Sequence, residues 1–101
     1  AKSYFKEYAG LDDSKAALFR KINTHIQDKG FFEELDLREL LKNGHYPDRE
    51  TLQEELNNLV RNNYLYYNPT RAEYKLQGRS MEIGLARYVQ EVDSYKNSGF
   101  A

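Results

Sequence analysis

The spacing of hydrophobic residues predicts three helices in the first two thirds of the chain. Apolar side chains recur every three or four residues over residues 12–28, 36–43 and 48–63. This spacing places them on one face of a helix. Each of the three segments therefore has one apolar side to bury against the others.

Capping residues separate these three segments. A carboxylate in the segment 11–14 can accept hydrogen bonds from the free amides at the start of the first helix, and Asp48 can do so for the third. Asp36 and Glu39 have the spacing of a capping box for the middle helix, and Gly30 follows the first helix as a C-cap. Because a short turn containing glycine joins the second and third helices, they are expected to form a helix-turn-helix.

The pattern then changes to that of a β-hairpin followed by a last helix. Residues 64–77 are rich in β-forming residues around turn chemistry at 68–71. Helical spacing returns at Ser80, before a polar tail at 93–101. Gly84 costs this helix about 1 kcal/mol of propensity, and it would permit close packing. The expected core comprises Leu18, Ile22, Leu40, Leu56, Leu59 and Leu76.

Tyrosine is concentrated on the expected hairpin. Alternation along the strand predicts that Leu65 and Tyr67 pack inward, whereas Tyr64 and Tyr66 lie partly outward. Outward tyrosines are suited to stacking on nucleic-acid bases or to anchoring a protein partner.

The expected fold is mainly α with a small β-hairpin, in the α+β class. The order helix, short strand, helix, helix, strand, strand over residues 11–79 resembles the winged helix-turn-helix, with a three-helix core, a wing and a C-terminal helix. On this interpretation residues 11–92 form the winged-helix domain. Residues 1–10 are a leading helix or the stub of a preceding domain, and 93–101 form the tail.

A finer resemblance is to the C-terminal winged-helix module of AAA+ and STAND-type ATPases of archaea and bacteria. It is carried by residues 56–65, a leucine-rich helix leading into a short hairpin, and by residues 74–76 before the last helix. The resemblance implies that ATP chemistry belongs to an upstream core. This chain contains no Walker A motif.

The composition and charge of the chain limit the functions and the compartment that can be expected for it. The 15 basic and 16 acidic residues give a formal net charge of -1, which disfavours a domain whose main task is to grip phosphate. The chain has no cysteine, which fits a reducing, cytoplasmic compartment. It also has no apolar stretch of bilayer length. We therefore expect a cytoplasmic protein with no membrane partner.

The sequence contains no set of residues with the types and spacing of a catalytic site. His25 and His45 have no second histidine at ligand spacing, so no metal site is expected. Paired carboxylates lie at helix starts or beside basic residues, where caps and solvated faces need acids. We expect no enzyme, no cofactor and no small-molecule substrate.

The leading hypothesis is an accessory or regulatory domain of a larger ATPase that contacts DNA, or a neighbouring domain of the same chain, through its wing. Such DNA contact would be directed to the backbone rather than to base edges in the major groove. The segment 48–55 at the start of the third helix has one basic and four acidic residues, and its carboxylates would be repelled by the phosphates of such a groove. The residues expected to contact nucleic acid are Arg71, Lys75 and Arg79 around the wing, with Arg49 on the third helix.

The alternative hypothesis is a protein-interaction module. It would dock through the acidic third helix and the tyrosine-rich hairpin. Its expected contact residues are Tyr64, Tyr66, Glu54 and Glu55.

Overall fold

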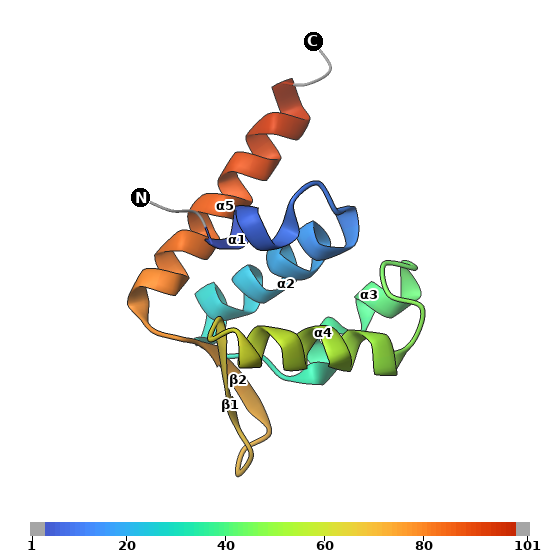
Figure 1. Cartoon of the computed structure of the whole chain (residues 1–101), viewed down its shortest axis with the longest axis vertical. Coiled ribbons are helices and arrows are strands. Elements are labelled where there is room, and N and C mark those ends of the chain that lie inside the picture. The colour runs from blue at the N-terminus through green and yellow to red at the C-terminus, as the bar shows by residue number, and fades with distance from the viewer. Residues whose placement is uncertain (1–3, 99–101) are drawn as a thin grey trace.

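The chain forms a mainly α-helical domain with a β-hairpin before its C-terminal helix, in the α+β class (Figure 1). The computed structural model describes the backbone of residues 4–98 and the side chains of residues 4–95. The elements are α1 (Tyr4–Ala9), α2 (Asp13–Lys29), a 3-10 turn η1 (Glu34–Leu37), α3 (Glu39–Lys42), α4 (Arg49–Arg61), β1 (Leu65–Asn68), β2 (Glu73–Leu76) and α5 (Arg79–Ser98).

Helix α2 lies in the middle of the molecule and begins and ends as its caps predict (Figure 1). The Asp12 carboxylate accepts a hydrogen bond from the Lys15 amide at 2.9 Å. At the other end Gly30 adopts φ 86° and donates its amide to the Ile26 carbonyl oxygen at 2.9 Å. A left-handed residue at this position is accessible to glycine at little cost.

The second predicted helix is wrong in its start and in its type. The capping box joins Glu33 and Asp36 rather than Asp36 and Glu39, and it opens a 3-10 turn that leads into the four-residue α3. A 3-10 turn has three residues per turn. Leu37 at the end of this turn and Leu40 in α3 are both buried.

Helix α4 is capped as predicted and contributes the apolar face expected of it. The Asp48 carboxylate accepts the Thr51 amide at 2.8 Å, which satisfies one of the free amides of the first turn. The predicted core residues of all elements are buried in one cluster: Leu18, Ile22, Leu40, Leu56, Leu59 and Leu76.

Both strands of the hairpin pack against the body, and the second strand also pairs with a residue outside the hairpin. Strands β1 and β2 pair antiparallel, with Leu65 opposite Leu76. Phe32, which follows α2, forms a bridge to Tyr74 with backbone hydrogen bonds of 2.8 and 3.0 Å. Their rings stack with centroids 5.1 Å apart. Since Phe32 pairs with β2 on the side away from β1, β1 is the outer strand.

Helix α1 packs into the same core as the other helices. The Phe5 ring lies edge-on to Phe19 at 5.0 Å and to Tyr64 at 5.2 Å between centroids. It also meets Tyr88 of α5. The leading helix expected from the sequence is thus present, and its apolar side is buried.

Helix α5 is longer than predicted. It continues through Ser98, so the segment expected to be a polar tail from Asp93 is helical as far as it is described, and residues 99–101 lie outside the described part. Asp93 forms an ion pair with Arg20 of α2. The C-terminal end of α5 extends past the other helices (Figure 1). The end of a helix that extends into solvent has mostly polar residues. Because hydrophobic periodicity is lost there, the sequence pattern predicted that the helix stops too early.

Within residues 4–98, no helix has both the length and the apolar content that crossing a bilayer requires.

Replacing Gly84 by alanine is expected to raise the free energy of unfolding by about 0.5–1 kcal/mol, because glycine inside a helix costs conformational entropy. A Cβ built at this position lies 3.8 Å from the Phe5 ring, which is ordinary contact. Thermal unfolding should show a midpoint raised by several degrees. The matched control is Gly30→Ala, which should lower the midpoint because φ there is 86°. A lower midpoint for Gly84→Ala would mean that α5 and Phe5 need the glycine for close packing.

Candidate functional site

The hairpin presents one side to the body and the other to solvent. Leu65, Tyr74 and Leu76 are buried against the helices. Tyr66 and Lys75 stand directly opposite each other on the other side, and Tyr66 is 51% exposed. Side chains directly opposite on one face of an antiparallel pair are close neighbours. This places a tyrosine ring beside an ammonium group on an open surface.

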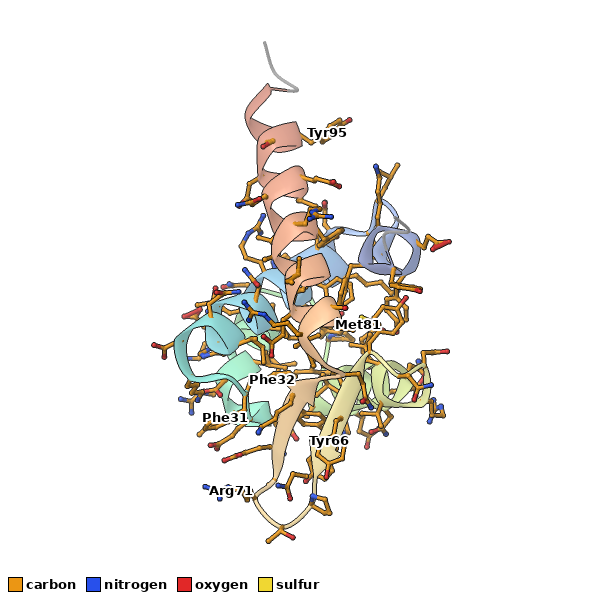
Figure 2. All side chains as sticks on the ribbon, turned by 90° about the vertical axis from the view of Figure 1, so that its left-hand side faces the viewer. Phe31, Phe32, Tyr66, Arg71, Met81 and Tyr95 are labelled. Carbon is orange, nitrogen blue, oxygen red and sulfur yellow. The ribbon has the colours of Figure 1, made fainter. Side chains whose placement is uncertain are left out.

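The tip of the hairpin is held by a side-chain turn. The Asn68 carboxamide oxygen accepts the backbone amides of Thr70 at 3.0 Å and Arg71 at 3.3 Å. Such Asx turns replace backbone pairing in a tight loop. Figure 2 shows Arg71 near the tip, with Tyr66 further up the hairpin. Arg79 begins α5 immediately beyond the base of β2. We call Tyr66, Arg71 and Lys75 the outer hairpin face.

The three predicted arginines each form an ion pair on the surface. Their side chains are at least 71% exposed, and exposed pairs of this kind are worth about 0–1 kcal/mol. The guanidinium groups are therefore available to a phosphate that competes with the carboxylate. The partners are Glu73 for Arg71 at 3.5 Å, Glu82 for Arg79 at 3.1 Å and Glu34 for Arg49 at 3.0 Å.

The structure does not bring all four predicted nucleic-acid contacts together. Arg71 and Lys75 belong to the hairpin, and Arg79 follows it. Arg49 is the first residue of α4, at the opposite end of that helix from β1. Arg71 and Lys75 thus share the hairpin, whereas Arg79 lines a hollow with Gln27 of α2 and Arg87 of α5, and Arg49 lies apart.

The predicted docking set for a protein partner is not assembled on one surface. Tyr64 is half-buried, and its ring packs against Tyr4, Phe5 and Tyr8. Its hydroxyl donates to the Tyr4 carbonyl oxygen at 2.9 Å. Tyr66 alone of the two predicted tyrosines lies on the outer hairpin face.

The adjacent residues Glu54 and Glu55 of α4 differ in how deeply their carboxylates are buried. Glu54 is exposed, whereas the Glu55 side chain is only 11% exposed. Glu55 accepts hydrogen bonds from the hydroxyls of Tyr8 and, at 3.4 Å, Tyr46. Lys15 lies 3.7 Å from the same carboxylate. The prediction that Glu55 is part of a docking surface is therefore not supported by its position.

Burial raises the pKa of the Tyr8 and Tyr46 phenols above the usual value for tyrosine and is the largest cause of the shift. The nearby Glu55 carboxylate raises both pKa values further. Both hydroxyls consequently stay protonated and serve as donors. Helical phase could have indicated this arrangement, because Glu55 directly precedes the buried Leu56 and follows the buried Leu52 by three positions. It thus borders the apolar face.

A groove of about 580 Å³ separates α4 from the inner side of the hairpin. Tyr67 has the inward side predicted for it, yet it is 36% exposed because its ring lines this groove. The groove was not apparent from the sequence, since it depends on how the hairpin sits against α4. It is lined from α4 by Gln53, Asn57, Val60 and Arg61, from the hairpin by Tyr67, Ala72 and Tyr74, and from η1 by Glu34.

Three polar side chains in the α4–hairpin groove are bonded to one another. The Gln53 amide nitrogen donates to the Asn57 side-chain oxygen and to the Tyr74 hydroxyl, both at 3.0 Å. Burial raises the pKa of Tyr74 above its usual value, and the Gln53 hydrogen bond opposes this shift. The neutral phenol is thus a fixed member of the groove wall.

No group of three or more metal-ligating side chains converges among the residues that the structure describes. His25 and His45 are both half-buried. Comparison of the chain with protein-family models, with curated proteins and with solved structures finds no match.

Proposed function

We propose that this chain is a non-catalytic winged-helix domain that contacts nucleic acid through its outer hairpin face. Two features support the winged-helix interpretation. Helices α3 and α4 are joined by a short turn, as in a helix-turn-helix. Phe32 pairs with β2, which gives the strand order Phe32, β2, β1. The hairpin then corresponds to the wing.

The observation that carries the nucleic-acid proposal is the pairing of Tyr66 with Lys75 on the exposed side of the hairpin, with Arg71 at its tip and Arg79 just beyond its base. Arginine and lysine bind phosphate oxygens without regard to sequence. A tyrosine ring stacks on any base or packs on a sugar. The outer hairpin face thus combines the two kinds of group that sequence-tolerant nucleic-acid binding uses.

Charge on α4 favours contact by the hairpin over insertion of the helix into a groove of DNA. Glu50 and Glu54 are both exposed on this helix. They would repel phosphates on either side of a major groove. Binding is therefore directed to the nucleic-acid backbone. The resemblance to the C-terminal module of AAA+ and STAND-type ATPases supports an accessory role beside a nucleotide-binding core.

The salt dependence of binding tests this proposal. Fluorescence anisotropy of labelled oligonucleotides between 25 and 200 mM NaCl should give an affinity that falls with a log-log slope of about -2 to -3, as three phosphate contacts require. Binding that is absent at 25 mM NaCl, or that does not change with salt, would contradict it. Capture of a protein partner that depends on Tyr66 in the absence of nucleic-acid binding would favour the docking alternative.

A further inference from the structure

Two successive tyrosines of β1 project on opposite sides of the hairpin. Tyr66 lies on the outer hairpin face, and Tyr67 lines the α4–hairpin groove on the other side. Both rings are at least 36% exposed. Successive residues of a strand alternate in this way. One strand therefore carries an accessible aromatic ring on each side of the ribbon.

The edge between the two rings is open. β2 is paired on both sides, with β1 and with Phe32, whereas β1 pairs with no strand other than β2 among residues 4–98. A chain-like ligand can therefore cross the β1 edge from one ring to the other. Arg71 at the tip, and Arg61 at the groove, are exposed cations close to this route.

The groove has the chemistry of a site for a planar heterocycle. Its volume of about 580 Å³ lies within the usual range for small-molecule sites, about 300–1,000 Å³. Within the described part of the chain, the Gln53 carboxamide oxygen and the Asn57 amide nitrogen have no hydrogen bond. Gln53 thus has an unbonded acceptor and Asn57 an unbonded donor, and both residues line the groove with Tyr67. A nucleobase edge presents the complementary groups, and carboxamides are the side chains that pair with adenine.

A peptide anchor fits this groove less well. Interface anchors are large side chains seated in desolvated pockets. Here the aliphatic lining consists of Val60 and Ala72, and the other groups are carboxamides, phenols, the Arg61 guanidinium and the Glu34 carboxylate. The carboxamide atoms of Gln53 and Asn57 that have no hydrogen bond among the described residues favour a base, which can pair with them, over a hydrophobic side chain, which cannot.

We propose that the hairpin binds an unpaired nucleic-acid strand that crosses the β1 edge, with one base on Tyr66 and another in the α4–hairpin groove against Tyr67. This inference rests on the proposed nucleic-acid function and specifies its substrate class. In a duplex the faces of the bases are stacked on one another and their pairing edges are occupied. A duplex can meet the cations of the outer hairpin face, but it cannot supply a base to the groove.

The test uses single-tryptophan variants, because the chain contains no tryptophan. Tyr66→Trp and Tyr67→Trp are each titrated at 25 mM NaCl with a 12-nucleotide single strand of mixed sequence and with the matched duplex. We expect the single strand to quench the emission of both variants. The duplex should leave the emission of Tyr67→Trp unchanged.

A second variant removes a groove contact without touching the core. Asn57 is exposed, so Asn57→Ala should fold as the parent does. It should weaken single-strand binding about fivefold or more, the size of a lost base contact, and leave duplex binding unchanged. The matched control is Asn43→Ala, an exposed amide at the end of α3 that is not among the groove-lining residues. This control should change neither affinity.

The outcomes separate the inference from the function on which it rests. If neither nucleic acid binds, or if Lys75→Gln has no effect on binding, the proposed function itself fails. If the single strand and the duplex bind equally tightly and the emission of Tyr67→Trp does not respond to either, the hairpin is a backbone contact only. The groove then belongs to another class of ligand, and the inference is overturned.

Discussion

Replacing Leu56 by alanine is expected to lower the free energy of unfolding by about 2–5 kcal/mol, as large-to-small substitutions in a core do. Leu56 is fully buried. It lies on the apolar face of α4 between Leu52 and Leu59, and all three belong to the single core cluster. A domain of this size has about 5–15 kcal/mol of stability in total. The loss should therefore be visible as a much lower urea midpoint with an unchanged slope.

The matched control for Leu56→Ala is Glu54→Ala on the same helix. Glu54 is exposed, and substitutions of this kind usually change stability by less than about 0.5 kcal/mol. Helix propensity favours alanine at both positions, so the difference between the two variants isolates the packing contribution. Equal midpoints for the two variants would show that α4 does not bury Leu56.

Changing Arg71, Lys75 and Arg79 together to glutamine is expected to weaken nucleic-acid binding to all sequences about equally. Loss of three phosphate contacts should make the log-log salt dependence shallower by about 2–3 units, which corresponds to about a tenfold or greater loss of affinity at low salt. All three side chains are exposed, so stability should change little. Anisotropy titrations across a salt series measure both quantities.

The control for the charge variant removes an acid instead of a base. Glu54→Gln should leave binding unchanged or tighten it, because an exposed carboxylate on α4 only repels the backbone. Glu55 is unsuitable for this purpose since it accepts hydrogen bonds from Tyr8 and Tyr46. A triple variant that binds as the parent does would show that the basic residues of the hairpin are merely solvated.

Elements that follow from local patterns were predictable from the sequence. Helices α2 and α4 carry apolar residues at helical spacing between a carboxylate cap and a stop, and alternation along β2 places Tyr74 and Leu76 inward. The middle helix was mispredicted because two overlapping acidic pairs satisfy the capping spacing. Choosing between them requires knowing that both Leu37 and Leu40 must reach the core.

Of the candidate site, only the features that follow from the alternation of side chains along a strand could be predicted from the sequence. Once the turn at residues 68–71 is placed, pairing puts Tyr66 opposite Lys75 on the outward side. Other features depend on how elements pack against each other. The α4–hairpin groove, the burial of Glu55 under two phenols and the packing of Tyr64 on α1 each join residues far apart in the chain. No local spacing encodes such contacts.

The bridge between Phe32 and Tyr74 has a consequence for the order in which the domain folds. It closes a long loop that contains α3, α4 and β1, and contacts between distant residues form at a large entropic cost. The helices can form earlier from local contacts. A shift of one residue in this pairing would turn Lys75 toward the core and Tyr74 toward solvent. We therefore expect docking of β2 onto Phe32 to be a late folding step that also determines which side of the hairpin a ligand meets.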